Sequence, residues 1–395
     1  MKTIISALFV FILSAYTQVH AQATTQIYGH VMTDVGYNFG QINPQWFDVM
    51  RPTQLATFQN QYAPDGQVYF SVRQTRMGVK VNVPTDKQEV KMWFEWELFG
   101  VGVDAGQTTF RLRHAYIEYG KWGVGQTNSP FMDMDIFPNS LEYWGPNAMV
   151  FFRNIQLRYM PIQGDSRLTF ALERPGASAD GGVYTDQIAL TDVRFRFMLP
   201  DFSMEYRRAT SFGYVELAGM LRYIQWEDAS EPEYDLSGSA VGWGFNLSSQ
   251  IKLGQKGLFK FQSVYGEGVQ NYINDAGVDI GIRRQTDNLE TPIQGEAMPV
   301  FTIMGFYDRQ WNDKWTSTIG MGYVDIAVSE AQNPDHFANG QYALANAIYY
   351  PFPNFMAGLE VQYGRRENFS DGWSTSIVKL QASFKYSFDV KLKNK

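Results

Sequence analysis

Charged side chains of both signs occupy every second position in several stretches of this chain. In the stretch KMWFEWEL at residues 91–98, lysine and glutamate alternate with methionine, phenylalanine and tryptophan. Residues two positions apart in an extended chain point to the same side, so the charges share one face and the apolar residues share the other. Fixed charges along a wet face can orient or select a charged solute. Two charges about 4 Å apart interact by roughly 4 kcal/mol at an effective dielectric constant near 20.

The two-residue period assigns a set of cations to the wet face. If that face lines the lumen of a membrane barrel, inward placement is favoured, because a cation facing lipid at the midplane costs about 2–4 kcal/mol. The candidate pore-lining basic residues are Arg76, Lys80, Arg111, Arg113, Arg158, Arg167, Arg207 and Arg222. The same face carries the acids Glu95, Glu97, Glu173, Glu205, Glu216, Asp308 and Glu360. For each of these charges the alternative is a residue that solvates the wall or pairs with a neighbour.

Residue types that carry catalysis do not gather in a recognisable spacing. The four histidines, at positions 20, 30, 114 and 336, are far apart and lack metal-ligand spacing. Neither a Gly-x-Ser-x-Gly elbow nor a P-loop is present. The chain has no cysteine, so it uses neither disulfides nor thiolate chemistry. We predict no enzyme activity, no catalytic residues, no cofactor and no metal site. A barrel-surface lipase, whose Ser and His would meet only in space, is an alternative without a supporting motif.

The elements that position the charges must be strands. Alternation recurs along the chain up to its end, and residues 378–388 show it without interruption. Beyond the leader, no apolar run has the length of a transmembrane helix. The content of aromatic residues is 16%, although the mean hydropathy is −0.29, as expected where polar lumen residues offset a lipid-facing belt. The pattern predicts an all-β fold, a single transmembrane antiparallel β-barrel. The net charge of −7 argues against nucleic acid as a partner.

The first residues have the form of a secretory signal peptide. Lys2 precedes a short apolar run, and Ala21 stands where signal peptidase requires a small residue. We assign residues 1–21 to the signal peptide, residues 22–388 to the barrel and residues 389–395 to a short basic periplasmic tail. A cut after Ala23 and a buried N-terminal helix are the alternatives. A Gram-negative outer membrane, with both termini in the periplasm, is the predicted location.

Counting strands gives an even number, as a closed antiparallel barrel with both termini on one side requires. A stretch at 193–198 resembles a strand, but counting it would break the alternation of short and long connections. We therefore place 176–200 in one long outer loop with local structure. The sixteen predicted strands are 25–38, 68–83, 89–99, 109–119, 122–126, 150–159, 167–174, 202–208, 214–226, 241–253, 258–267, 299–308, 316–324, 341–351, 355–365 and 375–388.

Several motifs in the first third of the chain carry a family resemblance. RQTRMGV at 73–79, LRHAYIE at 112–118, GQT at 125–127, FMDMD at 131–135 and FRNIQLRY at 152–159 occur in the order and spacing of the DcaP-like porins, which this chain resembles. Later support comes from PDF at 200–202, WTST at 315–318 and the closing strand. The chain departs from the family pattern at Asn128, where an aromatic residue is usual, and in the tail after Phe388.

The resemblance implies a trimeric, sixteen-stranded outer-membrane channel for small, often anionic, solutes. It also implies that residues 128–147, after the fifth strand, fold inward as a constriction loop, with Asp133, Asp135 and Glu142 facing basic residues of the wall. An ordinary outer loop is the alternative. The expected function is passive diffusion of small hydrophilic, anionic solutes, with outer-membrane lipid and two further copies of the chain as partners. A non-selective general porin and an adhesive barrel that acts through its long loops are the alternatives.

Overall fold

The structure is a computed structural model that describes residues 23–185, 190, 193–228, 235–285, 287 and 293–393. The predicted signal peptide and the last two residues of the predicted tail lie outside the described residues. Within these ranges, no helix has the length and apolar character needed to cross a bilayer. Short 3-10 helices lie in the loops: η2 (Pro44–Trp46), η3 (Pro52–Gln54), η4 (Gly102–Asp104), η5 (Gly182–Tyr184) and η7 (Gln270–Tyr272).

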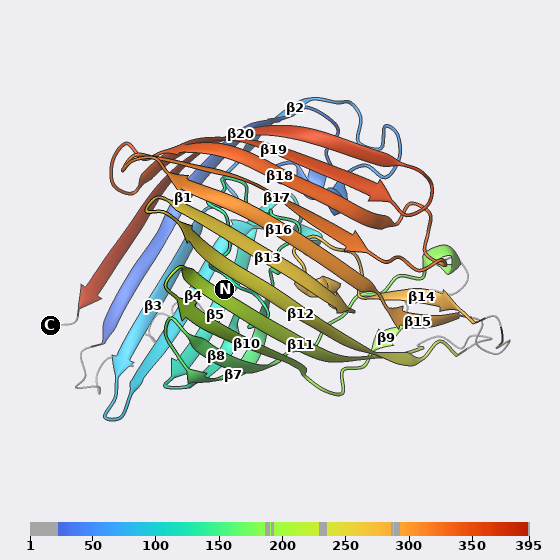
Figure 1. The fold of residues 1–395 in the computed structure, drawn as a ribbon, viewed down its shortest axis with the longest axis horizontal. Helices are drawn as coiled ribbons and strands as arrows, with labels where there is room; N and C mark the ends of the chain where they lie inside the picture. Colours follow the sequence, from blue (N-terminus) through green and yellow to red (C-terminus); the bar gives the residue numbers. More distant parts are fainter. Residues whose placement is uncertain are drawn as a thin grey trace, which may run out of the picture.

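Sixteen strands of the described chain close into one antiparallel barrel, which confirms the predicted fold class and strand number (Figure 1). Fifteen residue pairs, from Thr24↔Lys393 to Asn38↔Lys379, join the first strand to the last. Closure leaves no sheet edge in contact with lipid, which could not satisfy the backbone hydrogen bonds of an edge. The wall strands are β1 (Thr24–Asn38), β3 (Arg76–Pro84), β4 (Glu89–Phe99), β5 (Thr108–Tyr119), β6 (Trp122–Asn128), β7 (Arg153–Ile162), β8 (Arg167–Glu173), β10 (Asp201–Thr210), β11 (Gly213–Glu227), β12 (Gly238–Leu253), β13 (Gly257–Glu267), β16 (Pro299–Gln310), β17 (Trp315–Ile326), β18 (Phe337–Tyr349), β19 (Phe355–Asn368) and β20 (Ser374–Lys393).

Four shorter strands add to the wall or to the outer loops. β2 (Gln67–Ser71) and β3 pair with opposite ends of β1, so the predicted strand 68–83 is a wall strand interrupted at residues 72–75. β9 (Arg194–Phe195) pairs only with the end of β11, which confirms that 193–198 is local structure within a long connection. β14 (Ile280–Arg284) and β15 (Ile293–Ala297) form a separate hairpin.

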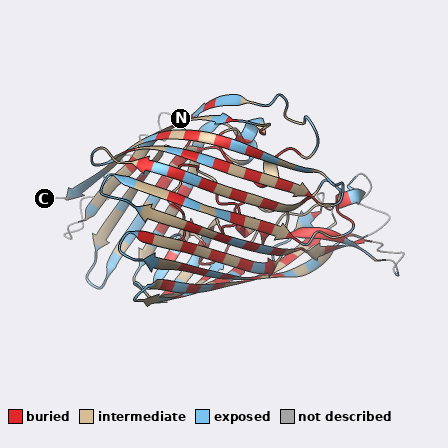
Figure 2. Cartoon of the chain, turned by 45° about the horizontal axis from the view of Figure 1, so that its top comes forward, coloured by how far each residue is buried: buried red, intermediate tan, exposed pale blue. Residues whose placement is uncertain are grey.

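The two-residue period of the sequence appears as alternating burial along the strands. On β11 nearly every second residue is buried and those between are more exposed, a pattern that Figure 2 shows on many strands. The inward set of β11 includes Ala218, Met220 and Arg222, whereas Leu217 and Leu221 are exposed on the outside. Outward apolar side chains face lipid, and inward side chains face the lumen or the loops folded into it.

Short and long connections lie at opposite ends of the barrel. Residues 85–88, 120–121 and 163–166 make short turns at the end where β20 finishes, on the left of Figure 1. The connections 39–66, 129–152 and 268–298 are long, and the β14–β15 hairpin projects from the opposite end. In outer-membrane barrels short turns face the periplasm and long loops face outward.

Part of the interior is packed by an apolar cluster rather than open. Phe131, Met132 and Ile136, from the connection after β6, pack in one apolar cluster with inward residues such as Val264 and Met304. Sequence patterning predicts a water-filled lumen for a barrel of this size, but inward apolar residues on β13 and β16–β18 bury the connection against that part of the wall. Open space remains on both sides of this cluster: one pocket is lined by residues of β4–β10, and another by residues of β12, β13, β16 and β17.

The prediction that residues 389–395 form a tail outside the barrel is wrong for residues 389–393, which the structure describes. Asp389 pairs with Tyr28, and the pairing continues to Lys393, so β20 runs five residues beyond Phe388. Val390 and Leu392 continue the exposed apolar set on the outside of the barrel. The strand is extended because β1 begins at Thr24, and its first residues would otherwise lack a partner on the β20 side.

Candidate functional site

The inner face of β3–β5 carries a cluster of arginines around two glutamates. Glu97 Oε2 lies 2.8 Å from Arg113 Nη1 and 3.1 Å from Arg76 Nη2, and Glu95 Oε1 lies 2.6 Å from Arg113 Nε. Arg111 and Arg153 each place a guanidinium nitrogen 3.8 Å from Glu97 Oε1. Four arginines around two carboxylates leave this part of the wall with an excess of positive charge.

Exposure divides the arginine cluster into an inner and an outer layer. The Arg113 side chain is 5% exposed and Glu97 is fully buried, so their ion pair belongs to the wall. Arg76 and Arg111 are 26% and 23% exposed. Since a solute meets exposed groups first, Arg76 and Arg111 are the members of the cluster that can contact it.

A β-bulge sets the inward direction of two consecutive residues. The register of β4 and β5 shifts between Glu95 and Trp96, and both Arg113 and His114 are buried. The His114 ring stacks on Trp93 with 3.5 Å between ring centroids. Bulges redirect side chains in this way. His114 was not among the predicted site residues. The adjacent polar residues Arg113 and His114, which interrupt the alternation of the strand, could have indicated that His114 also points inward.

Arg153 is a second residue that sequence patterning missed. Its side chain is only 4% exposed, although its position relative to the outward Ile155 and Leu157 would place it on the lipid side. Arg153 is the first residue of β7, where the alternation of a strand no longer restrains the side chain. Its terminal nitrogens have no hydrogen-bond partner within the described structure.

The predicted loop acids meet the predicted wall cations in a second cluster. Arg207 Nη2 lies 2.5 Å from Asp133 Oδ1, and its other terminal nitrogen donates to Asp135. Tyr214 Oη and Ser248 Oγ also donate to Asp133, at 2.7 and 2.6 Å. These contacts tie the connection after β6 to the inner face of β10–β12.

Arg167 adds a partly exposed cation to the second cluster. Its guanidinium lies 3.1 Å from Glu205 and 3.0 Å from Glu216. Glu216 also accepts from Arg207 Nε at 2.6 Å. Asp135 is half exposed, so the cluster presents both signs of charge at its open edge.

Glu142 holds two connections together through hydrogen bonds to the backbone. Its carboxylate accepts hydrogen bonds from the backbone N–H of Met50, at 2.9 Å, and of Gly145. Glu360 on β19 accepts from the backbone N–H of Leu141 and of Glu142, at 2.7 and 3.1 Å. The inward Lys379 of β20 also lies within electrostatic range of this carboxylate, so Glu142 faces one basic residue of the wall while backbone donors hold it in place.

Arg222 is enclosed and does not line open space, contrary to its prediction as a pore-lining residue. Its side chain is fully buried, 3.0 Å from Asp201 and 3.1 Å from Asp279. It also donates to the carbonyl oxygens of Gly268 and Gly176. Burial raises the pKa of Asp279 even though Arg222 opposes that shift. Arg222 thus fastens the 268–298 connection to the wall.

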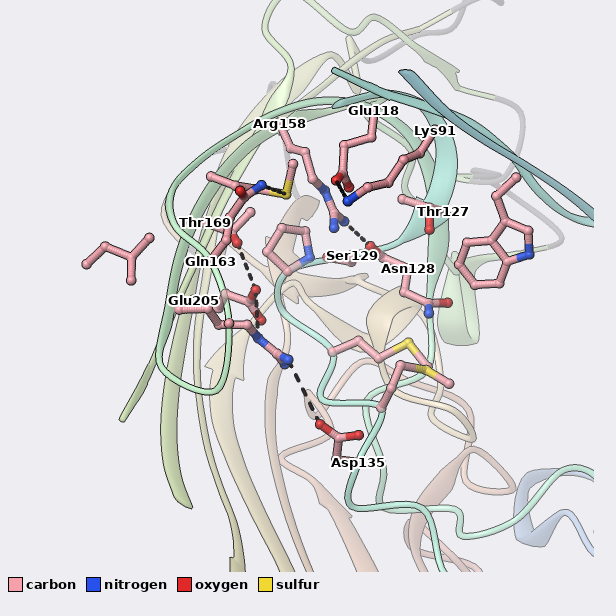
Figure 3. Close-up of a pocket in the computed structure, with 18 residues that line it drawn as sticks. Lys91, Glu118, Thr127, Asn128, Ser129, Asp135, Arg158, Gln163, Thr169 and Glu205 are labelled. Carbon is pink, nitrogen blue, oxygen red and sulfur yellow. Dashed lines mark hydrogen bonds and ion pairs between the residues drawn. The ribbon is translucent and has the colours of Figure 1, made fainter. Parts of the chain in front are cut away.

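A pocket of about 420 Å³ opens at the short-turn end of the lumen (Figure 3). Lys91, Arg158 and Arg167 line it together with Glu118, Asp135 and Glu205. Figure 3 shows Arg158 beside Asn128, whose backbone oxygen accepts from the guanidinium at 2.5 Å, and Lys91 beside Glu118, 3.0 Å away. Lys80 lies four residues after Arg76 on β3 and is exposed. Its Nζ atom is 4.7 Å from the centroid of the Trp93 ring.

The predicted basic residues thus fall into two groups. Arg76, Lys80, Arg111, Arg158 and Arg167 remain at least partly exposed inside the barrel, whereas Arg113, Arg207 and Arg222 are buried in ion pairs. Among the residues described, no three His, Asp or Glu side chains gather in a way that could hold a metal ion.

Three solved structures with the same architecture are distant from this chain in sequence. The outer membrane channel DcaP of Acinetobacter baumannii shares 18% identity, with 93% of this chain and 97% of that chain covered and a TM-score of 0.77. An anion-selective porin from Comamonas acidovorans shares 10% identity over 93% and 100% of the two chains, with a TM-score of 0.58. OmpT of Vibrio cholerae shares 10% identity, with 93% of this chain and 98% of that chain covered and a TM-score of 0.56. At these identities the likeness establishes the fold.

Family membership rests on the sequence. No curated protein sequence matches the chain. A model of the family described as DcaP outer membrane protein matches residues 16–388, which confirms the resemblance seen in the first third of the chain and extends it to Phe388. This chain therefore belongs to the DcaP outer membrane protein family, and its barrel lies in the outer membrane.

Proposed function

We propose that this barrel is a channel for passive diffusion of small hydrophilic solutes and that it prefers anions. The observation that carries the proposal is the series of water-accessible cations along β3–β8. Arg111 and Arg76 stand toward the long-loop end, Lys80 follows, and Arg158 and Arg167 line the pocket at the short-turn end. An apolar cluster packs the connection after β6 against β13 and β16–β18, and we expect this packing to direct solutes toward these cations.

The connection after β6 supports a narrow path. Its residues Asp133 and Asp135 contact β10, while Leu141 contacts β19, so the segment 129–152 reaches opposite parts of the wall. We propose that this segment constricts the lumen, with Asp135 at its open edge. In a narrow aqueous slot a charge about 4 Å away contributes roughly 4 kcal/mol, against about 1 kcal/mol in bulk water.

A general porin with little selectivity is the second candidate. Glu118, Asp135 and Glu205 share the short-turn pocket with three cations, so the net charge of the pocket itself is close to zero. If the channel is non-selective, the arginines around Glu97 stabilise the wall and do not select solutes by charge. The adhesive alternative is favoured by a separate apolar cluster that contains Leu190, Ile282 and Ala331 and orders the outer loops.

We also propose a homotrimer, a cleaved signal peptide at residues 1–21 and a periplasmic location for both termini. One solved form of Vibrio cholerae OmpT, which shares 12% identity and has a TM-score of 0.55, is described as a trimer. The short turns and the end of β20 lie at the same end of the barrel, as a periplasmic C-terminus requires.

The reversal potential of the purified protein in a planar bilayer, under a salt gradient, tests both parts of the proposal. We expect stable open steps and an anion preference. Arg208 is exposed on the outer face of β10, so Arg208→Gln changes the net charge equally without altering the lumen and is the control for lumen variants. Absence of open steps contradicts a channel, and a cation preference contradicts the proposed selectivity.

A further inference from the structure

The chain between β9 and β10 bulges out of the barrel wall. Arg196 N donates to Gln225 O at 2.8 Å, and Phe202 pairs with Leu221, so residues 196 and 202 both lie along β11. Of the five residues between them, Phe197, Met198, Leu199 and Pro200 are exposed, whereas Asp201 is buried; Met198 and Leu199 are 55% and 57% accessible. An apolar segment therefore stands on the outside of the barrel.

A groove lies between this bulge and the outer face of the neighbouring strands. Its volume is about 500 Å³, and its lining includes Ile155 and Leu157 on β7, Leu172 on β8 and the bulge itself. These side chains point outward, since the alternate residues Asn154, Gln156 and Glu173 are buried. The groove occupies the long-loop half of the wall, because β7 begins there and β8 ends there.

Arg174 lies at the end of the groove, directly after the last residue of β8. It is exposed, and among the residues that the structure describes none forms an ion pair with it. The nearby Arg196 is paired with Glu227, and the Glu173 carboxylate is buried, where it accepts from Ser129 at 2.6 Å. The groove thus combines an apolar floor with a cation that has no ion-pair partner among the described residues, in the long-loop half of the wall.

We propose that this groove binds one acyl chain of an outer-leaflet lipid whose phosphate pairs with Arg174. An acyl chain matches the apolar lining, and a phosphate matches the fork of guanidinium donors, which binds such groups through two parallel hydrogen bonds. Basic side chains beside apolar membrane-facing surfaces recognise anionic lipid headgroups by the same combination of contacts. The site is separate from the lumen, so it does not depend on the proposed permeation path.

The test measures lipid binding to the folded, delipidated barrel by native mass spectrometry. The probes are bis-phosphorylated lipid A, a diacylglycerol with chains of similar length and inorganic phosphate. We expect one tightly retained lipid A per barrel and weak retention of diacylglycerol. Arg174→Gln should weaken lipid A retention roughly tenfold, as expected for the loss of one charge-assisted contact. Met198→Ser should weaken retention of both lipids.

Arg208→Gln is the matched control, because Arg208 is also exposed on the outer face but lies at the short-turn end. Heat-modifiable gel mobility verifies that each variant is folded. Equal loss in Arg174→Gln and Arg208→Gln, or equal binding of lipid A and diacylglycerol, overturns the proposal. Competition by millimolar inorganic phosphate alone would indicate a phosphate site without an acyl-chain site. Dissociation of an oligomer by Arg174→Gln with unchanged lipid retention would indicate a contact between subunits.

Discussion

At the level of single side chains, arginines that the sequence pattern predicts to be equivalent differ in how far they are exposed to water. Arg111 and Arg113 both point inward from β5, but Arg111 is partly exposed and Arg113 is buried against Glu95 and Glu97. An exposed charge acts on solutes through water, whereas a buried ion pair acts on the stability of the wall. Neutralising each of them should therefore change different measurable properties.

Arg111→Gln is expected to reduce anion preference while the barrel stays folded. The charge is screened by water and salt, so we expect the permeability ratio to fall roughly threefold, or about 0.7 kcal/mol. The reversal potential in a planar bilayer measures this ratio. An unchanged reversal potential, with Arg208→Gln as the reference, would exclude Arg111 from the permeation path.

Arg113→Leu is expected to destabilise the barrel by about 3 kcal/mol. Removing one partner leaves Glu95 and Glu97 buried with fewer cations, and such losses cost about 3–5 kcal/mol. The lower value is appropriate because Arg76 and Arg153 stay near Glu97. The temperature at which heat-modifiable gel mobility is lost reports the effect. Stability equal to that of Arg111→Gln would contradict the inner position of Arg113.

The contact between Asp180 and His336 should make one part of the outer loops sensitive to acid. His336 Nδ1 lies 3.3 Å from Asp180 Oδ2, and this hydrogen bond lowers the pKa of Asp180 below 3.8. A depressed carboxyl pKa contributes stability above the ordinary pKa, and that contribution is lost as pH falls through the lowered value. Hydrogen exchange of residues 178–185 should accelerate below about pH 3.8 in the wild type. Asp180→Asn should remove this step; a step that persists in the variant would assign it to another group.

At the level of elements, the connection after β6 is held by buried polar contacts. Asp133 is fully buried and accepts from Arg207, Tyr214 and Ser248. Asp133→Asn removes the charge and one acceptor, which we expect to weaken the tether by about 2 kcal/mol. Single-channel recordings should show a larger or noisier conductance. Asp135→Asn is the control, since Asp135 is half exposed, and equal effects of both substitutions would contradict anchoring through Asp133.

The end of β20 gives a second prediction at this level. Ending the chain after Phe388 removes the partners of Thr24 to Tyr28, so we expect a folded barrel destabilised by about 2–4 kcal/mol. Ending it after Ser383 also removes the partners of the central part of β1 and exposes a sheet edge to lipid, so insertion should fail. Heat-modifiable mobility in outer-membrane fractions distinguishes the two outcomes. Insertion of the shorter chain would contradict the assigned closing strand.

At the level of the whole molecule, the proposed trimer predicts how channels appear. Three barrels that insert together should open in groups of three equal conductance steps. Semi-native electrophoresis of the unheated protein should show a species about three times the mass of the chain. Single independent steps and a monomeric band would contradict the trimer but leave the barrel and its path unaffected.

The sequence by itself determined the strands, their closure and the direction of most side chains. A strand has a period of two, and lipid on one side with water on the other makes that period visible in residue type. The sixteen strands and the inward direction of Arg76, Arg111 and Arg167 follow from this local rule.

The tertiary structure alone decided which inward residues meet water. Arg222 forms an ion pair with Asp279, and Glu142 accepts a hydrogen bond from the backbone of Met50. Both partners lie in loops, where residue types do not alternate, so the sequence could not distinguish these buried residues from accessible ones. Arg153 and His114 were missed because the end of a strand and a bulge each break the alternation. The common physical reason is that loop packing depends on contacts between residues far apart in the chain, whereas alternation depends only on the nearest neighbours along a strand.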